Sequence, residues 1–498
     1  MTDLFSAYEV QAPGATIPAY LIESTAPNNI DDPATNLSVP PNTEAISADV
    51  AIGRIVDHLM AFANPTLVVN VHGFNNPRDI VLPGYWNTFE FVTKDDYIKN
   101  REIVVVGYRW PSEKIGIPDR TSFKAAPWFL IGLLIVGGLS SVVALFAYTL
   151  PQILRVTIGG FGAFALTISL TLLLLRIVVY FRDGYRATSF GVPDLVEVIR
   201  QIDKKLADKD DRRNHVELSF IAHSMGAYVV TSVVRILSDV FSPASVKPSV
   251  NMGVASADEP AESPDIIGHV FRLMRLVLVS PDIPAEALIS NRANFLAASL
   301  HRFKEAFLFS NEGDEVLRQI STTANYFSFP TSSREYGYRL GNVGVLRSGD
   351  KSANGKYGID KYAIPPGVDL KKLRIGYMTL NKLYDQLDNS GLGQLQRDLP
   401  NCFSYFDCTD CVDNGKGMLT LARPGKKNKL WPWKHLFLLL RYLWSRSPDV
   451  HGGYFKSQFL ETLIYRLVCI GYAETEKAYA GKLNSECERH QVKALVKT

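Results

Sequence analysis

Residues 218–230, LSFIAHSMGAYVV, place one serine where an apolar, strand-like run meets a helix-like run. A strand that turns directly into a helix leaves little space where the two backbones cross, so the positions two before and two after the serine must be small. Ala222 and Gly226 meet this requirement, although alanine stands where the G-x-S-x-G pattern has glycine. The segment predicts a strained turn that presents the hydroxyl of Ser224; a buried serine that bonds its own turn is the alternative.

Apolar strand-like runs alternate with helical patterns on both sides of this turn. The further runs are at residues 67–71, 103–108, 276–279, 306–309 and 403–406. Strands that are apolar throughout, with helices between them, are typical of a parallel sheet covered on both faces. We therefore expect an α/β fold with a doubly wound, mostly parallel sheet.

Two long apolar runs, residues 128–150 and 156–175, carry no charge and are separated by the single charged residue Arg155. A helix needs about 20 apolar residues to cross a bilayer, and each run is that long. Pro151 marks the turn between them. The pattern predicts a transmembrane hairpin; a hairpin buried in a soluble core is the alternative. Close approach of its helices is favoured by small residues, namely Gly137, Gly138, Gly159, Gly160 and Gly162.

A two-helix hairpin returns the chain to the side of the membrane that it left, so the segments before and after it share one compartment. Basic residues flank both ends of the hairpin: Lys114, Arg120, Lys124, Arg176, Arg182 and Arg186. Because cytoplasmic flanks are enriched in Lys and Arg, we expect a two-pass integral membrane protein with its remaining mass on the cytoplasmic face. A lipid bilayer is the first expected partner.

The formal net charge of +3 gives no field that would favour nucleic acid as a partner. The five cysteines and the lack of a secretory signal at Met1 suggest a reducing compartment. Cys408 and Cys411 have CxxC spacing, but a closed zinc site needs about two more soft ligands at similar spacing, and there is no second CxxC. We expect neither a metal nor a cofactor.

Composition divides the chain into segments around these runs. We expect an N-terminal extension at 1–45, sheet-forming parts at 46–124, 182–320 and 401–470, the hairpin at 125–181, a cap-like insertion at 321–400, and a polar C-terminal helix at 471–498. Residues 426–446, KKNKLWPWKHLFLLLRYLWSR, combine tryptophans and basic residues around a short apolar core. This segment suits a helix in the membrane interface, with a core-packing helix as the alternative.

Several short motifs fit one family. HGFNN at 72–76, AHSMGAY at 222–228, SPDIP at 280–284, SNEGDEVL at 310–317 and the late His451 together resemble an α/β-hydrolase. More narrowly, they are similar to a bacterial α/β-hydrolase family whose substrates are largely undefined. The resemblance covers about residues 67–467. It implies a serine, acid and histidine in that chain order, with the acid after the second strand beyond the elbow.

This order implies Ser224 as nucleophile and Asp314 as acid. Asp314 follows the run at 306–309, while Asp282 lies one strand too early and Asp407 and Asp410 lie one strand too late; these three remain rivals. An ordinary helix cap is the alternative role for Asp314.

The histidine is expected after the last core strand. His451 begins a glycine-rich loop that can return over the sheet, whereas His435 lies in an apolar helical segment and remains the rival. A surface loop histidine is the alternative for His451. We expect His72 and His223, which are fixed by their own turns, to bond backbone groups.

The implied chemistry is acyl transfer through a covalent serine intermediate, with backbone N–H groups of Phe74 and Met225 as the oxyanion hole. The hairpin favours membrane-resident acyl esters as substrates, and thus an esterase or lipase. A thioesterase, an amidase or an acyltransferase would use the same residues, and a non-catalytic scaffold on the same fold is a further alternative.

Overall fold

The computed structural model describes residues 4–11, 16–27, 37–112, 127–177, 179–209, 216–238, 266–284, 300, 302–311, 313–321, 339–342, 345–346, 358–359, 374–375, 378–379, 403–414, 416–417 and 450–496. Two compact units make up the chain: residues 1–112 with 186–498, and residues 113–185. The expected cap-like insertion lies mostly outside the described residues. The expected interfacial helix and His435 lie wholly outside them.

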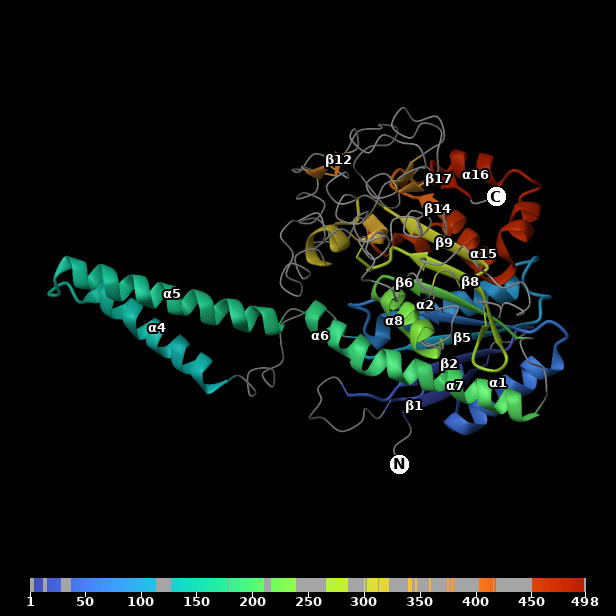
Figure 1. Ribbon diagram of the computed structural model, residues 1–498, viewed down its shortest axis with the longest axis horizontal. Helices are drawn as coiled ribbons and strands as arrows, with labels where there is room; N and C mark the ends of the chain where they lie inside the picture. The colour runs from blue at the N-terminus through green and yellow to red at the C-terminus, as the bar shows by residue number, and fades with distance from the viewer. Residues whose placement is uncertain are drawn as a thin grey trace, which may run out of the picture. The chain divides into compact units, whose positions relative to one another are not determined.

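The larger unit is built on an 11-stranded sheet of described strands (Figure 1). Its order is β17-β14-β9-β8-β6-β4-β5-β2-β1-β3, with β7 added beside β8. The bounds are β1 Phe5–Val10, β2 Ala19–Ser24, β3 Thr43–Ile46, β4 Thr66–Val71, β5 Ile103–Arg109, β6 Val216–His223, β7 Ile266–Ile267, β8 Phe271–Val279, β9 Glu305–Ser310, β14 Phe403–Asp407 and β17 Lys493–Leu495.

Every pairing from β2 through β14 in this order is parallel, and the antiparallel pairings lie at the two edges and at β7. Strands β4 and β5 are buried along their whole length because helices cover both of their faces. The expected α/β class with a mostly parallel sheet is confirmed. The carboxyl ends of β4, β6 and β9 therefore meet at one edge of the sheet.

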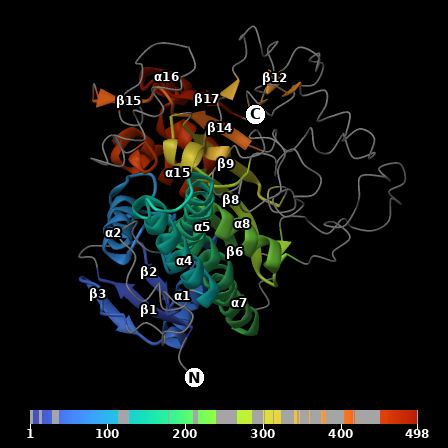
Figure 2. The same ribbon diagram turned by 90° about the vertical axis from the view of Figure 1, so that its left-hand side faces the viewer.

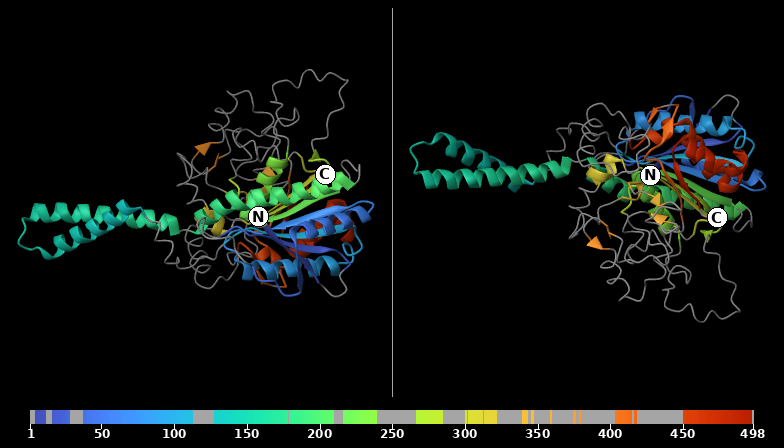
Figure 3. Two further views of the ribbon diagram at one scale, coloured as in Figure 1. Left: turned by 90° about the horizontal axis from the view of Figure 1, so that it is seen from below. Right: turned by 90° about the horizontal axis from the view of Figure 1, so that it is seen from above.

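Helices form a layer on each face of the sheet. Helix α1, Ala48–Ala61, packs beside α7, Val192–Lys209, which in turn packs beside α8, Met225–Leu237. The opposite face carries α2, Arg78–Lys94, and α15, Gln458–Ala478. Figure 3 shows the green helices α7 and α8 and the red helix α15 on opposite sides of the sheet. This three-layer arrangement buries apolar side chains on both faces.

The remaining helices and strands are shorter or peripheral. Helix α6, Val179–Arg186, continues through a π-helical turn, Ala187–Gly191, into α7, and α16, Leu483–Arg489, follows α15. Short helical turns lie at Val316–Ser321, Leu340–Asn342 and Gly453–Lys456. Two-residue strands pair off the main sheet as β10 Val345–Leu346 with β11 Gly358–Ile359, β12 Arg374–Ile375 with β13 Met378–Thr379, and β15 Val412–Asp413 with β16 Lys416–Gly417.

Two boundary expectations need correction. Residues 1–45, expected as an N-terminal extension, contribute β1, β2 and most of β3 to one edge of the sheet, where β2 is fully buried (Figure 2). Residues 471–498 are not a single polar helix, since β17 pairs antiparallel with β14 at the other edge. In each case a short strand is stabilised by a partner far away in the sequence, which local helix or loop preference does not encode.

The smaller unit contains two packed helices, α4 Trp128–Phe146 and α5 Gln152–Ile177. Both contain a window that is long and apolar enough to cross a membrane, with only 11% and 17% of those windows buried. A Cβ atom added to Gly162 would lie 2.7 Å from the backbone nitrogen of Ser141, so glycine permits the close approach. A Cβ on Gly137 would lie 3.0 Å from the backbone nitrogen of Leu166 in α5, but nothing lies within 4 Å of a Cβ on Gly138 or Gly160.

The described cysteines, Cys408, Cys411, Cys469 and Cys487, are all buried as free thiols. Burial raises the pKa of Cys411 to about 12 and that of Cys469 to about 12, because a thiolate is poorly solvated inside the core. No group of three or more His, Cys, Asp or Glu side chains that could hold a metal ion occurs in the described part of the chain. The CxxC pair is therefore protonated at neutral pH and packed in the core.

We expect these four thiols to resist alkylation in the folded protein. For Cys411 and Cys469, a pKa of about 12 in place of the usual 9.0 leaves a thiolate fraction about a thousandfold smaller at pH 7. Burial restricts the access of reagents to all four thiols. Iodoacetamide labelling followed by mass spectrometry, with urea-unfolded protein as the control, measures this. Rapid labelling of Cys408 or Cys411 in the folded state would contradict a packing role for the pair.

Candidate active site

Ser224 occupies the predicted sharp turn between β6 and α8. Its backbone has φ 54° and ψ −124°, in the positive-φ region that residues other than glycine rarely adopt. Such a conformation costs on the order of 1–3 kcal/mol and persists where the surrounding structure enforces it. Here the Ser224 N–H donates to Val279 O at 3.0 Å, and its carbonyl accepts from the N–H of Asp282 at 3.0 Å. Neighbouring β8 and the loop after it thus hold the turn.

Two glycines let the end of β4 press against this turn. A Cβ on Gly226 would lie 2.5 Å from His72 O and 2.6 Å from Val71 O. A Cβ on Gly73 would lie 2.6 Å from the Cβ of Ser224. Gly226, two places after Ser224, must therefore be small because the end of β4, which leads into the HGFNN segment, contacts the turn at this point.

We expect Gly226→Ala to destabilise the protein by about 1–3 kcal/mol, because the added methyl group meets backbone carbonyls that cannot move aside cheaply. Gly53→Ala is the matched control, since a Cβ at that helical position meets nothing within 4 Å and alanine favours a helix. Thermal unfolding of the solubilised protein measures both. An unchanged midpoint for Gly226→Ala would mean that the strand end and the turn are not in this contact.

Asp314 and His451 are far apart in the sequence and bonded in the structure. The Nδ1–H of His451 donates to Asp314 Oδ2 at 2.7 Å, and both side chains are buried. Asp314 follows β9, and His451 lies just before the helical turn that leads into α15. This bond sets the tautomer in which Nε2 carries the lone pair, the form required of a base.

The Asp314 carboxylate is held from several sides. Its Oδ1 accepts from the N–H of Leu317 at 3.1 Å, which is the capping contact weighed as its alternative role. Its Oδ2, in addition to His451, accepts from the hydroxyl of Ser280. The two roles are compatible because separate oxygens perform them. A carboxylate fixed in this way orients the imidazole it binds.

Two of the three rival acids, Asp282 and Asp407, bond to groups other than His451. Asp282 pairs with Arg339, with 3.1 Å between Oδ1 and Nε, and accepts from the hydroxyl of Ser321 at 3.0 Å. Asp407 accepts from the hydroxyl of Thr409 and lies 3.4 Å from Nζ of Lys493. Of the aspartates considered, the structure brings Asp314 to His451.

Three further contacts place the His451 ring beside the elbow. The Nε2–H of His223, the residue before Ser224, donates to the carbonyl oxygen of His451 at 3.0 Å. The two imidazole rings have centroids 4.8 Å apart. The ring of Phe74 lies edge-on to His451, with centroids 6.2 Å apart. The turn of Ser224, the HGFNN segment and the loop of His451 thus converge at the carboxyl ends of β4 and β6.

The hydroxyl of Ser224 is buried and makes no hydrogen bond with the described residues. A buried hydroxyl that bonds its own turn was the alternative interpretation, and that bond is not present among them. An unsatisfied buried hydroxyl is costly and therefore calls for an explanation. A reactive role explains it, because the hydroxyl would then bond a substrate or a base during the reaction.

His72 has a structural role, as expected. Its Nδ1–H donates to Gly73 O at 2.8 Å, its Nε2 accepts from the N–H of Trp110 at 3.2 Å, and its ring stacks on the Trp110 indole with centroids 5.0 Å apart. Burial, with a smaller effect from Arg109, lowers the pKa of His72 to about 3, so the ring is neutral at working pH. It holds the turn that carries Phe74.

The sequence did not single out some of the residues that support the site. Ser280 begins the SPDIP motif, yet only the structure shows that its hydroxyl contacts Asp314. Asn311, in the SNEGDEVL motif, donates through Nδ2 to Val450 O at 2.9 Å and so anchors the histidine loop. A polar residue directly after a buried strand was the available signal for both, because such positions meet at one edge of a parallel sheet.

Comparison of the chain with protein-family models, with curated proteins and with solved structures finds no match. Its function must therefore be inferred from the geometry of this site.

Proposed function

We propose that this protein is a membrane-anchored serine hydrolase of the α/β-hydrolase fold that cleaves acyl esters. The observation that carries the proposal is the meeting of a buried Asp314–His451 pair with the strained turn of Ser224. A nucleophile, a histidine and a carboxylate that orients it form the recurring constellation of serine hydrolases. The site needs no metal or cofactor for this chemistry.

The order of strands supports the α/β-hydrolase fold. Counted from β1, the strands that form the central sheet come in the order β1-β2-β5-β4-β6-β8-β9-β14. The nucleophile follows β6, the acid follows β9, which lies two strands further on, and the histidine follows β14. This is the chain order of triad residues that the family uses.

In the proposed mechanism, His451 takes the proton from Ser224 Oγ through Nε2 while that oxygen attacks the acyl carbon. The tetrahedral intermediate collapses as His451 returns the proton to the departing alcohol oxygen, which leaves an acyl-enzyme. Water, deprotonated by His451, then attacks the acyl carbon. His451 returns this proton to Ser224 Oγ as the bond between the acyl carbon and Oγ breaks, which releases the acid and restores the enzyme. Asp314 stabilises the imidazolium in each step without accepting its proton.

The oxyanion needs about two preorganised N–H donors, and removal of one donor typically costs about a hundredfold or more in rate. We assign this role to the backbone N–H groups of Phe74 and Met225. Their placement supports the assignment, since Met225 begins α8 directly after the nucleophile and Gly73 brings the Phe74 segment against Ser224. Phe74 would act through its backbone, while its ring packs on His451.

We further propose that α4 and α5 form a transmembrane hairpin, with the catalytic residues on the cytoplasmic side. Two packed helices with mostly exposed apolar side chains support the first part, and the basic flanks support the second. Membranes washed with alkaline carbonate should retain the protein. Its release into the supernatant would contradict the hairpin.

Anchoring favours membrane-resident acyl esters as substrates. The test is hydrolysis of esters of increasing acyl length by the full-length protein, in detergent and in vesicles. Long-chain esters at an interface should be preferred over short soluble esters. A preference for short soluble esters with no gain at an interface would reject lipids as substrates and leave the serine hydrolase proposal standing.

A further inference from the structure

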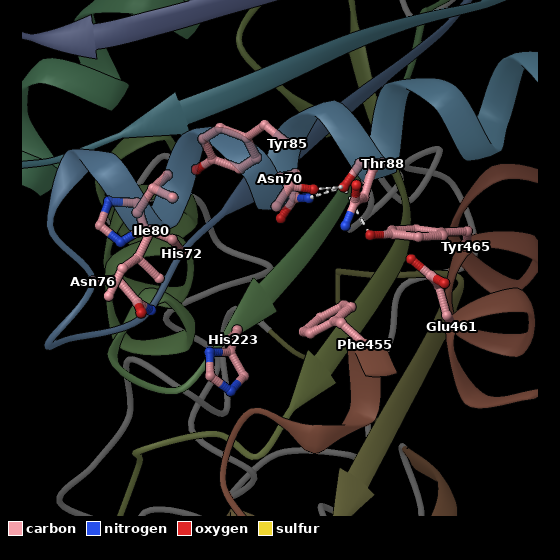
Figure 4. A pocket seen from close by; sticks show the side chains of 13 residues that line it. Asn70, His72, Asn76, Ile80, Tyr85, Thr88, His223, Phe455, Glu461 and Tyr465 are labelled. Carbon is pink, nitrogen blue, oxygen red and sulfur yellow. Dashed lines mark hydrogen bonds between the residues drawn. The ribbon is translucent and has the colours of Figure 1, made fainter. Parts of the chain in front are cut away.

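A cavity of about 130 Å³ lies between α2 and α15, beside the candidate active site (Figure 4). Neither Ser224 nor His451 lines it. Its wall includes His223, which contacts His451, and Phe455, whose ring centroid is 5.8 Å from that of His223. One imidazole ring thus separates the cavity from the histidine that would protonate a departing alcohol.

The far wall is a chain of buried polar side chains, Asn70, Thr88 and Tyr465, drawn in Figure 4. The hydroxyl of Thr88 donates to Gly84 O at 3.0 Å, and it accepts from Asn70 Nδ2 at 3.2 Å. Its contact with the Tyr465 hydroxyl, at 2.7 Å, must then have Tyr465 as the donor. The Tyr465 hydroxyl can therefore only accept a further hydrogen bond. Asn70 keeps its Oδ1 acceptor and one N–H of Nδ2, so the wall offers two acceptors to a ligand with N–H or O–H donors.

Glu461 gives this cavity a negative charge. Its carboxylate lines the cavity one helical turn before Tyr465 and has no ion-pair or hydrogen-bond partner among the described residues. It is half-buried, and this burial raises its pKa. An acidic side chain is favoured in the first turn of a helix, and Glu461 lies in the first turn of α15. That preference does not explain why its carboxylate lines a cavity and has no counter-charge there. A cation in the cavity would supply one.

Aromatic rings complete the cavity. Phe455 and Tyr465 lie with ring centroids 6.2 Å apart, and Tyr85 adds a third ring to the lining. Ring faces attract ammonium groups, most strongly where water is excluded. Carboxylate, hydrogen-bond acceptors and aromatic rings together form the environment that a protonated amine prefers.

We propose that this cavity binds a primary ammonium group carried by the alcohol portion of the substrate. The assignment to the alcohol portion rests on the proposed function, because the departing alcohol lies on the side of His451. The preferred substrates would then be esters of amino alcohols. The ammonium site itself depends only on the cavity and its lining.

The first test measures binding without turnover. Saturation-transfer NMR on the full-length solubilised protein compares aminobutanol with butanediol, which replaces the ammonium group by a hydroxyl. We expect aminobutanol to bind at least about tenfold more tightly, and Glu461→Gln to remove that difference. Glu474→Gln, on the exposed face of α15 and paired with Arg101 and Lys477, is the matched control. Equal binding of the two probes, no binding of aminobutanol, or unchanged binding in Glu461→Gln would overturn the proposal.

The second test compares hydrolysis of an aminobutyl ester and a hydroxybutyl ester of the same acid. Glu461→Gln should raise KM about tenfold for the aminobutyl ester alone, while Ser224→Ala should stop hydrolysis of both. If Glu461→Gln affects both esters equally, the cavity assignment fails and the hydrolase proposal stands. If neither ester is cleaved but aminobutanol binds through Glu461, the hydrolase proposal fails and the ammonium site stands.

Discussion

Ser224→Ala should abolish ester hydrolysis, with kcat reduced by about 10⁴-fold or more, while the protein remains folded. The loss follows because Ser224 Oγ is the atom that forms the acyl-enzyme in the proposed mechanism. Folding should be preserved, since the Ser224 hydroxyl is buried without a hydrogen bond to the described residues. Turnover of the best acyl ester, together with thermal unfolding of the same preparation, measures both expectations.

Ser224→Gly provides a sharper version of this test. Glycine adopts φ 54° without the strain that serine bears there, so we expect this variant to be inactive and yet more stable by about 1 kcal/mol. A gain in stability with loss of activity would identify strain that is kept for function. A loss of stability in Ser224→Gly would instead mean that the serine side chain supports the fold. Full activity of this variant would show that Ser224 is not the nucleophile.

Asp314→Asn should reduce kcat by about 10⁴-fold with little change in KM, because the amide can bond His451 in the wrong tautomer. Its buried contacts with Ser280 and Leu317 make some loss of stability expected as well. Asp407→Asn is the matched control: it is also a buried aspartate, at the end of the neighbouring strand β14, but its contacts are with Thr409 and Lys493.

The comparison of the two aspartates separates catalysis from folding. We expect Asp407→Asn to lose stability while the remaining folded fraction keeps its kcat. The same kcat loss in both variants would point to disruption of the sheet edge rather than to a role of Asp314 toward His451. Full activity of Asp314→Asn would mean that another carboxylate, such as Asp282 or Asp410, orients His451.

The sequence was sufficient to predict the central geometry because that geometry follows chain order. Ser224 was predicted from the small residues around a strand-to-helix turn. Asp314 was predicted from the strand order that the family resemblance implies, because parallel strands deliver the residues after them to one edge. His451 could be predicted because a glycine-rich loop followed the last strand. Their catalytic roles stay predictions, since the structure gives their contacts and not their reactivity.

Sequence reasoning missed the parts that depend on distant partners. The strands β3 and β17 are short, with four and three residues, and each pairs with a strand from another part of the chain. The cavity was missed for the same reason, since Asn70 and Thr88 reach Tyr465 only after α15 packs against α2. Nothing in the local pattern around Glu461 distinguishes it from an ordinary acidic residue at a helix start.

The most direct measurement of the central claim is labelling of the solubilised wild-type protein and of Ser224→Ala with a fluorophosphonate probe. This reagent forms a covalent bond with a serine only when a nearby base activates its hydroxyl. The account predicts that one serine of the wild type is labelled, that mass spectrometry identifies it as Ser224, and that the variant is not labelled. Absence of labelling in folded wild-type protein, or equal labelling of the variant, would contradict it.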